Sequence, residues 1–182
     1  NVPDGSKLDG AQLASIFAHS RHLQGLARAH PQSITEILSG SAGDVVAKAM
    51  AELEAAASEI TEETAMIKAI RRLRQQSALA VALADMAAIA PVDAQMGWLS
   101  AAAESALRAA VTYLFRRAAR RGQIADETVI TAPGMAGCGW VVLALGKLGA
   151  GELNYSSDID LILLHDPIDN PLTDPETSQA TY

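Results

Sequence analysis

The apolar residues of this chain change their spacing near position 122, and this change constrains the fold more than any other feature. Through residues 1–121 they recur every three to four positions, as on one face of a helix. Farther along they gather in two short runs, Trp140–Leu145 and Asp158–His165, which are typical of buried strands. We therefore predict an α+β fold that is mostly α. A helical region, residues 1–121, precedes residues 122–182, which begin a β-sheet.

Prolines, glycines and acidic residues divide the helical region into segments. The first helical stripe runs over residues 8–31. Pro31 is suited to the first turn of the next helix, and Gly40 is suited to end it. The stretch "SGSAGD" predicts a short break, after which Asp44 caps another helix. Two longer helices follow, one opened by Thr61 and interrupted by Pro91, the other from Val92 to about Arg121.

Composition limits the classes of protein that this chain can belong to. Hydrophobic residues make up 49% of the 182 residues, enough for a packed core, and the net charge is -7. A general nucleic-acid binder normally presents a basic face, so we expect no nucleic acid as a partner. A single cysteine requires no oxidising compartment, and no apolar run reaches membrane-spanning length. We expect a cytoplasmic protein with no membrane partner.

Both ends of the chain indicate a piece of a longer protein. The sequence does not begin with Met. Near the other end, Pro175 is suited to the first turn of a helix, with Asp174 as its cap. The chain then stops at Tyr182, about two turns into that predicted helix. We therefore expect the chain to be a fragment.

Two carboxylates open the second predicted strand. Side chains alternate along a strand, so Asp158 and Asp160 share one face. At a separation of about 5 Å and an effective dielectric near ~20 they repel by roughly 3 kcal/mol. A raised pKa, an arginine partner or a divalent cation can offset this repulsion. A cation fits best, because hard oxygen ligands suit Mg²⁺, with Mn²⁺ as an alternative.

The turn before the acidic pair favours a phosphate ligand. Gly146 follows the first predicted strand directly, and two more glycines follow at close spacing. Glycine allows the backbone to approach a phosphate closely. Lys147 supplies a positive charge, although a solvated turn lysine explains it equally well. Ser156 and Ser157 supply hydroxyls: a turn hydrogen bond explains Ser156 equally well, and Ser157 is favoured as a phosphate contact because it adjoins Asp158. Strand, glycine turn and Asp-x-Asp together are more specific than any one of them.

The combined pattern resembles the DNA polymerase β-like nucleotidyltransferase superfamily, with its Gly-Ser turn followed by Asp-x-Asp on the next strand. More narrowly, "ALGKLGAGELNYSSDIDLILLHD" closely resembles the bifunctional glutamine synthetase adenylyltransferase/adenylyl-removing enzymes. Their motif is Gly-Lys-Leu-Gly-Gly, then Glu-Leu, then Ser-Asp-x-Asp-Leu. The dense part of the match covers residues 143–166. The upstream stretch "IRRLRQQSALAVALADMAAI" is similar to the helical region that precedes the motif in that family.

The resemblance implies a function. That family carries two copies of the catalytic domain: the N-terminal copy removes AMP from a tyrosine of glutamine synthetase by phosphorolysis, giving ADP, and the C-terminal copy attaches AMP from ATP. "ELNYSSDIDL" and the long helical lead-in resemble the N-terminal copy. Residues 122–182 would then begin a nucleotidyltransferase-type mixed sheet. A PII-type signalling protein and glutamine are implied as regulators.

The resemblance also assigns roles to individual residues. Asp158 and Asp160 would be catalytic and would bind the metal, while Gly146, Lys147 and Ser157 would contact the nucleotide or phosphate. In the full-length protein, the resemblance implies that adding AMP to glutamine synthetase and removing it would regulate nitrogen assimilation.

The chain departs from the superfamily pattern in three places. Lys147 occupies the position of the superfamily's serine, which is the narrower family's own form, and Ala150 replaces the family's second glycine. The third carboxylate, which the superfamily places on a later strand, has no candidate strand before Tyr182. We therefore expect the catalytic set to be incomplete and the fragment alone to be inactive.

Three other interpretations stay open. The chain could be the adenylylating copy, or another nucleotidyltransferase such as an aminoglycoside-modifying enzyme. The helical lead-in and the motif argue against the latter. It could also be a non-catalytic regulatory or docking module that keeps the fold. Metal-dependent nucleotide binding separates the enzymes from such a module.

Overall fold

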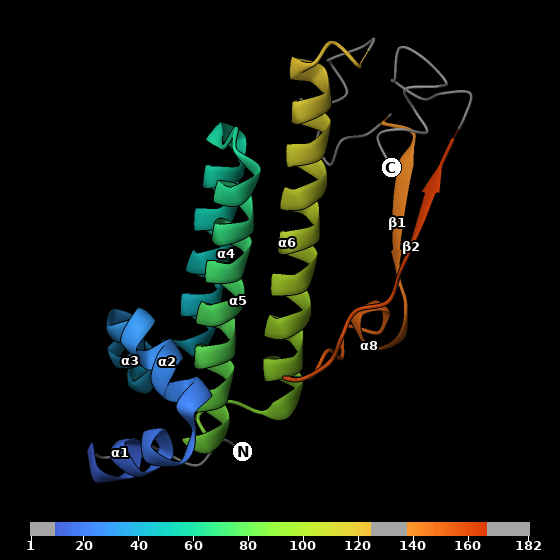
Figure 1. Cartoon of the computed structure of the whole chain (residues 1–182). Coiled ribbons are helices and arrows are strands. Elements are labelled where there is room, and N and C mark those ends of the chain that lie inside the picture. Colours follow the sequence, from blue (N-terminus) through green and yellow to red (C-terminus); the bar gives the residue numbers. More distant parts are fainter. Residues whose placement is uncertain (1–9, 125–137, 167–182) are drawn as a thin grey trace.

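Three long helices form the body of the molecule. The computed structural model describes residues 10–124 and 138–166. Helices α4 (Ala42–Glu59), α5 (Glu63–Met86) and α6 (Val92–Arg120) lie side by side, and each contacts the other two (Figure 1). The two long helices predicted on either side of Pro91 are confirmed: α6 has the expected ends to within one residue, whereas α5 ends at Met86, several residues before Pro91.

The first predicted helix is two helices. Helix α1 spans Gly10–His19 and α2 spans Arg21–Ala29, with Ser20 between them. Ser20 has an extended backbone (φ -133°, ψ 101°), and its Oγ accepts a hydrogen bond from the Leu23 N–H at 3.2 Å. The expectation of one helix was wrong because serine at this position caps a new helix, and its side chain competes with the helical backbone.

The predicted break around Gly40 was also wrong. Helix α3 (Pro31–Glu36) begins with proline, as expected, and passes into a π-helical turn, Ile37–Ser41, which runs directly into α4. Ile37 is fully buried in the core. A wider π-helical turn absorbs the glycine without ending the helical path, because continuing that path buries Ile37. Asp44 accordingly lies in the first turn of α4 and is not an isolated cap.

The connection between α5 and α6 turns at an unusual residue. Ala88 has φ +52°, and it is the one non-glycine residue with positive φ in the described parts of the chain. The Ile89 N–H donates to the Ala84 carbonyl at 3.0 Å, and the Ala88 N–H donates to the Asp85 carbonyl at 3.0 Å. This left-handed helix end is one that glycine normally occupies.

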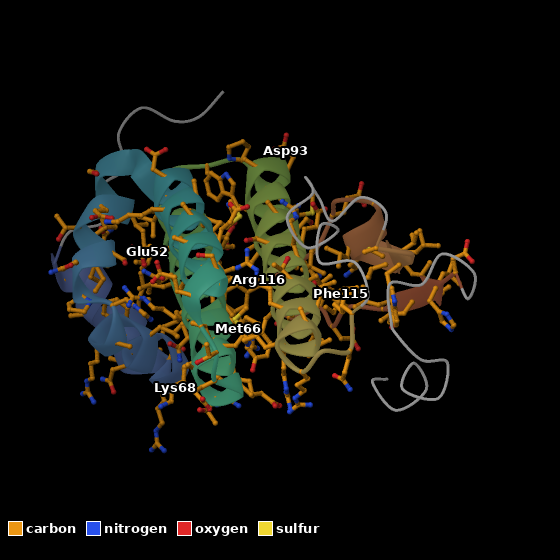
Figure 2. All side chains as sticks on the ribbon, turned by 90° about the horizontal axis from the view of Figure 1, so that it is seen from above. Glu52, Met66, Lys68, Asp93, Phe115 and Arg116 are labelled. Atoms are coloured by element: carbon orange, nitrogen blue, oxygen red, sulfur yellow. The ribbon has the colours of Figure 1, made fainter. Side chains whose placement is uncertain are left out.

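The core lies between α4, α5 and α6, with α2 and the π-helical turn at one end. Polar contacts close the opposite end. The Tyr113 hydroxyl donates to the Thr61 carbonyl at 3.2 Å, and Arg117 forms an ion pair with Glu63 at 2.6 Å. Figure 2 shows Arg116 between α5 and α6, and its Nη1 donates to the Ala57 carbonyl at 3.3 Å. The largest fully buried side chains are Ile37, Val46, Leu73, Leu79 and Leu83.

A two-stranded sheet lies beside α6, on the side away from α4 and α5 (Figure 1). Strands β1 (Trp140–Ala144) and β2 (Leu161–His165) pair antiparallel, with Trp140 opposite His165 and Ala144 opposite Leu161. The short helix α8 (Gly146–Gly149) follows β1. The predicted α+β, mostly α class is confirmed. The boundary between residues 121 and 122 and the mixed sheet stay predictions.

The strands are more exposed than their sequence suggests. β2 begins at Leu161, so the acidic pair precedes the strand instead of opening it. Val141 and Leu143 pair with Leu164 and Ile162, and all four side chains are exposed. The expectation of buried strands was wrong because, among the described residues, α6 is the one long helix beside the sheet and it covers little of it: Leu163, on the same face as Trp140, is also exposed.

Candidate active site

Aromatic contacts attach the sheet to α6 at one end. The Trp140 ring meets Phe115 edge to face, with centroids 6.3 Å apart and planes at 86°, and stacks on His165 at 5.7 Å. Figure 2 shows Phe115 on the side of α6 that faces the strands. The two strands therefore have a defined position on the helix, and so does the turn that they lead to.

The α8 turn requires glycine at two positions, for different reasons. Gly146 has φ +56°, a conformation that side chains disfavour. A Cβ on Gly149 would lie 2.3 Å from the Ala144 carbonyl oxygen, which no real structure tolerates. The Gly149 N–H donates to the Leu145 carbonyl at 3.1 Å, so the turn folds back tightly on the end of β1. Ala150 follows with φ -84°, so alanine is compatible with the turn at that position.

The structure brings Asp160 and Gly146 together. The Leu145 N–H donates to the Asp160 carbonyl at 2.9 Å, which extends the strand pairing by one residue. As a result, Asp160 Oδ2 lies 3.8 Å from the place where a Cβ on Gly146 would be. The carboxylate therefore stands directly beside the glycine turn.

The other predicted site residues lie around this turn. Asp158 and Lys147 are exposed, and Ser157 is half-buried. The Ser157 N–H donates to the Asn154 carbonyl at 3.2 Å, and its hydroxyl donates to Asn154 Oδ1. The Ser157 side chain, predicted to contact phosphate, is thus engaged in a turn hydrogen bond in this structure. Lys147 holds the turn through its carbonyl, which accepts from the Glu152 N–H at 2.8 Å.

No described Lys or Arg side chain forms an ion pair with Asp158 or Asp160. An arginine partner, one of three ways to offset their repulsion, is therefore not found in the described parts of the chain. Two exposed carboxylates beside a glycine turn fit Mg²⁺, which typically takes one or two protein carboxylates and completes its shell with water and phosphate oxygens. Within residues 10–124 and 138–166, no three His, Cys, Asp or Glu side chains are grouped for metal binding.

Sequence reasoning missed the residues that attach this loop to the helices. The Leu153 N–H donates to Ser100 Oγ of α6 at 3.1 Å, and Leu153 is only 7% exposed. Asn154 and Tyr155 border a cavity against α5 and α6. The available signal was weak: Ser100 is one of two serines in an alanine-rich helix, and Leu153 is an aliphatic residue in a polar loop.

The chain matches a family of adenylyltransferases. It belongs to the glutamate-ammonia ligase adenylyltransferase family, whose model covers residues 10–180.

Curated relatives agree with this assignment, and three of them are each called a bifunctional glutamine synthetase adenylyltransferase/adenylyl-removing enzyme. The one from Xanthobacter autotrophicus is 40% identical over 163 residues, which is 90% of this chain and 16% of the relative. The Bradyrhizobium diazoefficiens protein is 39% identical over 155 residues, 85% of the chain and 15% of the relative. The Caulobacter vibrioides protein is 35% identical over 171 residues, 92% of the chain and 17% of the relative.

The chain spans about 16% of the length of the curated relatives that it matches. No solved structure showed significant similarity to it. In the described parts of the chain, every helix is too short or too polar to cross a membrane.

Proposed function

We propose that this chain is the N-terminal part of the adenylyl-removing domain of a glutamine synthetase adenylyltransferase. Family membership and the names of the relatives support an enzyme of this kind. The observation that carries the proposal is the position of the Asp160 carboxylate beside the positive-φ Gly146, with no described cation paired to it. The resemblance of "ELNYSSDIDL" to the family's N-terminal copy supports the choice of half-reaction.

In this proposal, the substrate is glutamine synthetase that carries AMP on a tyrosine. An oxygen of inorganic phosphate attacks the AMP phosphorus, and a new phosphorus–oxygen bond forms as the bond to the tyrosine oxygen breaks. The tyrosine leaves with the electron pair and takes a proton, and the products are ADP and unmodified enzyme. The overall change is nucleotidyl transfer from tyrosine to phosphate.

The residues of the chain contribute position and charge. Asp158 and Asp160 would hold Mg²⁺ or Mn²⁺, which supplies electrostatic stabilisation of the transferring phosphoryl group. Gly146 lets the backbone approach the phosphate oxygens, and Lys147 offers a cation at the same turn. Ser157 fixes the turn before Asp158, and its hydroxyl also has lone pairs and reach for a phosphate contact. The third carboxylate would come from a later part of the full-length protein.

The full-length protein would act in the cytoplasm and would perform the opposing reaction with ATP elsewhere in its chain. A PII-type signalling protein and glutamine would regulate it. Glutamine synthetase as a partner is supported by the names of the relatives, while the regulators come from the family resemblance alone.

The test uses full-length protein, adenylylated glutamine synthetase, phosphate and Mg²⁺, with ADP formation as the measurement. We expect the double variant Asp158→Asn/Asp160→Asn to lose phosphate-dependent release by about 100-fold or more. Glu152→Gln is the matched control, because Glu152 is an exposed acid of the same loop outside the proposed site. We expect Glu152→Gln to release AMP at the wild-type rate.

Two results would change the proposal. If the double variant keeps phosphate-dependent release but loses AMP transfer from ATP, this domain is the adenylylating copy. If it keeps both activities and the fragment shows no metal-dependent nucleotide binding, the domain is a non-catalytic module.

A further inference from the structure

The loop that leads to the acidic pair is held by the helical region at a defined point. Leu153 is buried, and its N–H donates to Ser100 Oγ at 3.1 Å. Ser100 is itself buried, and its hydroxyl donates to the Met96 carbonyl at 2.9 Å. Because the Ser100 hydroxyl donates to the Met96 carbonyl of its own helix, the orientation of the Ser100 Oγ lone pairs is fixed. One of these lone pairs accepts the hydrogen bond from the Leu153 N–H of the loop.

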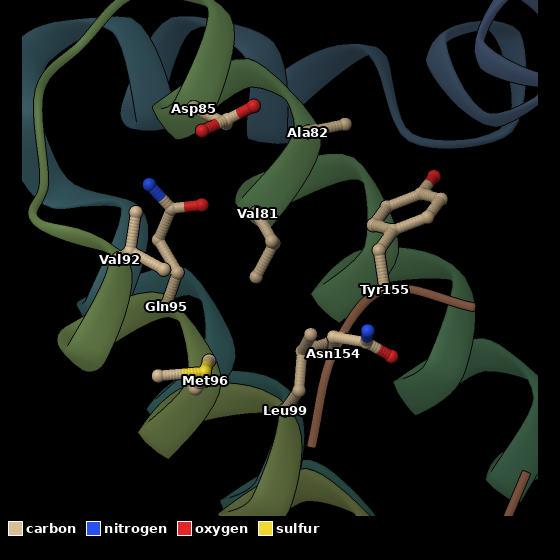
Figure 3. Close-up of a pocket in the computed structure, with 9 residues that line it drawn as sticks. All are labelled: Val81, Ala82, Asp85, Val92, Gln95, Met96, Leu99, Asn154 and Tyr155. Carbon is tan, nitrogen blue, oxygen red and sulfur yellow. The ribbon is translucent and has the colours of Figure 1, made fainter. Parts of the chain in front are cut away.

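The next two residues lie against α5 and α6. Figure 3 shows Asn154 and Tyr155 beside side chains of both helices, around a cavity of about 170 Å³. Val81 and Leu99 line this cavity from α5 and α6. Burial raises the pKa of the Tyr155 hydroxyl, and the positive charge of Arg74 on α5 opposes part of that rise. Tyr155 lines the cavity and is 42% exposed, so the helices cover only part of its side chain.

A hydrogen-bonded turn connects the helix contact at Asn154 and Tyr155 to the carboxylates of Asp158 and Asp160. The Ser157 N–H donates to the Asn154 carbonyl, and the Ser157 hydroxyl donates to Asn154 Oδ1. Residues 154–157 therefore form a hydrogen-bonded turn. Asp158 follows that turn immediately, and the carbonyl of Asp160 is held by the Leu145 N–H. The acidic segment is thus held from β1 on one side and from the helices on the other.

We propose that Ser100 and Tyr155 are positioning residues, which clamp the loop on α5 and α6 and thereby place the Asp158 and Asp160 carboxylates for the reaction. The proposal rests on the function proposed above, and it makes the helical region part of the active-site framework. Neither residue needs to touch substrate. Both act through the short stretch of backbone between Leu153 and Asp158.

The experiment uses the full-length protein with the variants Ser100→Ala and Tyr155→Ala. We expect each to lower kcat for AMP release by about 10- to 100-fold, the effect typical of groups that orient metal ligands. KM for phosphate should change by less than about 3-fold, because binding groups stay in place. The Mg²⁺ concentration for half-maximal activity should rise. Hydrogen exchange of residues 156–161 should become faster.

Two further variants separate positioning from general stability. Tyr155→Phe keeps the ring in the cavity, and we expect it to restore kcat to within about 2-fold of wild type. Tyr113→Phe removes a part-buried hydroxyl bond at the other end of α6, and we expect normal kcat and normal exchange of residues 156–161.

The kcat values and the exchange rates of these variants test the clamp directly. The proposal is overturned if Tyr155→Ala and Ser100→Ala keep wild-type kcat, or if Tyr113→Phe lowers kcat as much as they do. Faster exchange of residues 156–161 without a fall in kcat also overturns it. These failures are distinct from a failure of the proposed function, in which the Asp158→Asn/Asp160→Asn variant itself stays active. In that case there are no catalytic carboxylates to position, and the clamp proposal falls as well.

Discussion

The helical region and the two-stranded sheet use the same aliphatic residues with opposite results. Leu79 and Leu83 of α5 are completely buried, whereas Val141 of β1 and Leu163 of β2 are 52% and 57% exposed. Helices α4, α5 and α6 pack against one another and enclose a hydrophobic core between them. Among the described residues, α6 is the one long helix beside the sheet, and the face turned away from Trp140 carries exposed Val141, Leu143, Ile162 and Leu164.

This difference shows what supports the candidate site. A two-stranded sheet is only marginally stable by itself. Here the Trp140 contacts with Phe115 hold one end and the Leu153–Ser100 hydrogen bond holds the other. The site therefore takes its geometry from the helical region, although its chemical groups lie on the sheet and its turn.

The largest effect should come from truncating a core leucine. Leu83→Ala should lower the free energy of unfolding by about 2–5 kcal/mol, because it removes packed methyl groups and leaves a cavity. The matched variant Leu164→Ala, on the exposed face of β2, should cost about 1 kcal/mol or less. Urea unfolding followed by far-UV circular dichroism measures both. Equal losses would contradict the comparison, because they would mean that the outer face of the sheet is covered in solution.

A methyl group at Gly149 should damage the turn while sparing the helices. Gly149→Ala brings Cβ against the Ala144 carbonyl, and we expect a local cost of about 3 kcal/mol. Hydrogen exchange should become faster in β1 and β2 and stay slow in α4–α6. Gly151→Ala is the control: it has open space and a strained φ of +71°, so it should cost about 1 kcal/mol. Faster exchange throughout the helices would show that the two regions unfold together.

Removing the Tyr113 hydroxyl should weaken the helical region alone. Tyr113→Phe leaves the part-buried Thr61 carbonyl without its side-chain donor, and we expect a loss of about 1 kcal/mol in the free energy of unfolding. Thermal unfolding measures the change. An unchanged melting temperature would indicate that water replaces the hydroxyl at this carbonyl.

Glycine at position 88 should stabilise the helical region slightly. Ala88 has φ +52°, and Ala88→Gly relieves that strain at the expense of a more flexible unfolded chain, for a net gain of about 0.5 kcal/mol. Ala87→Gly, one residue earlier in a right-handed conformation, should instead destabilise by about 1 kcal/mol. If both variants destabilised equally, the left-handed conformation at Ala88 would be wrong.

The smallest effect concerns pH. The pKa of Tyr155 is raised in the folded state, so the unfolded state loses this proton first as pH rises. Stability should therefore fall as pH rises from about 10 through the folded pKa, and the contribution should be fully present below pH ~10. Urea midpoints between pH ~9 and ~11 measure this slope, and Tyr155→Phe should remove part of it. An identical slope in Tyr155→Phe would mean that the ring is solvated.

Much of the helical region was predictable from local sequence. Pro31 begins a helix and Pro91 precedes another, since proline suits the first turn and cannot continue a helix. The errors occurred where a local signal had two meanings. Ser20 caps α2 inside an apparently continuous stripe of apolar residues. Gly40, expected to end a helix, lies within a π-helical turn that also contains the buried Ile37.

The sequence alone determined the helical stripes, the glycine turn and the spacing from Gly146 to Asp160, because those depend on propensities and contacts within a few residues. Only the tertiary structure decided that Asp160 Oδ2 stands beside Gly146, that most of β2 and part of β1 are exposed, and that Leu153 is held by Ser100, 53 positions away. The reason is physical: contacts between distant residues depend on how whole helices pack, and residue spacing along the chain does not encode that packing.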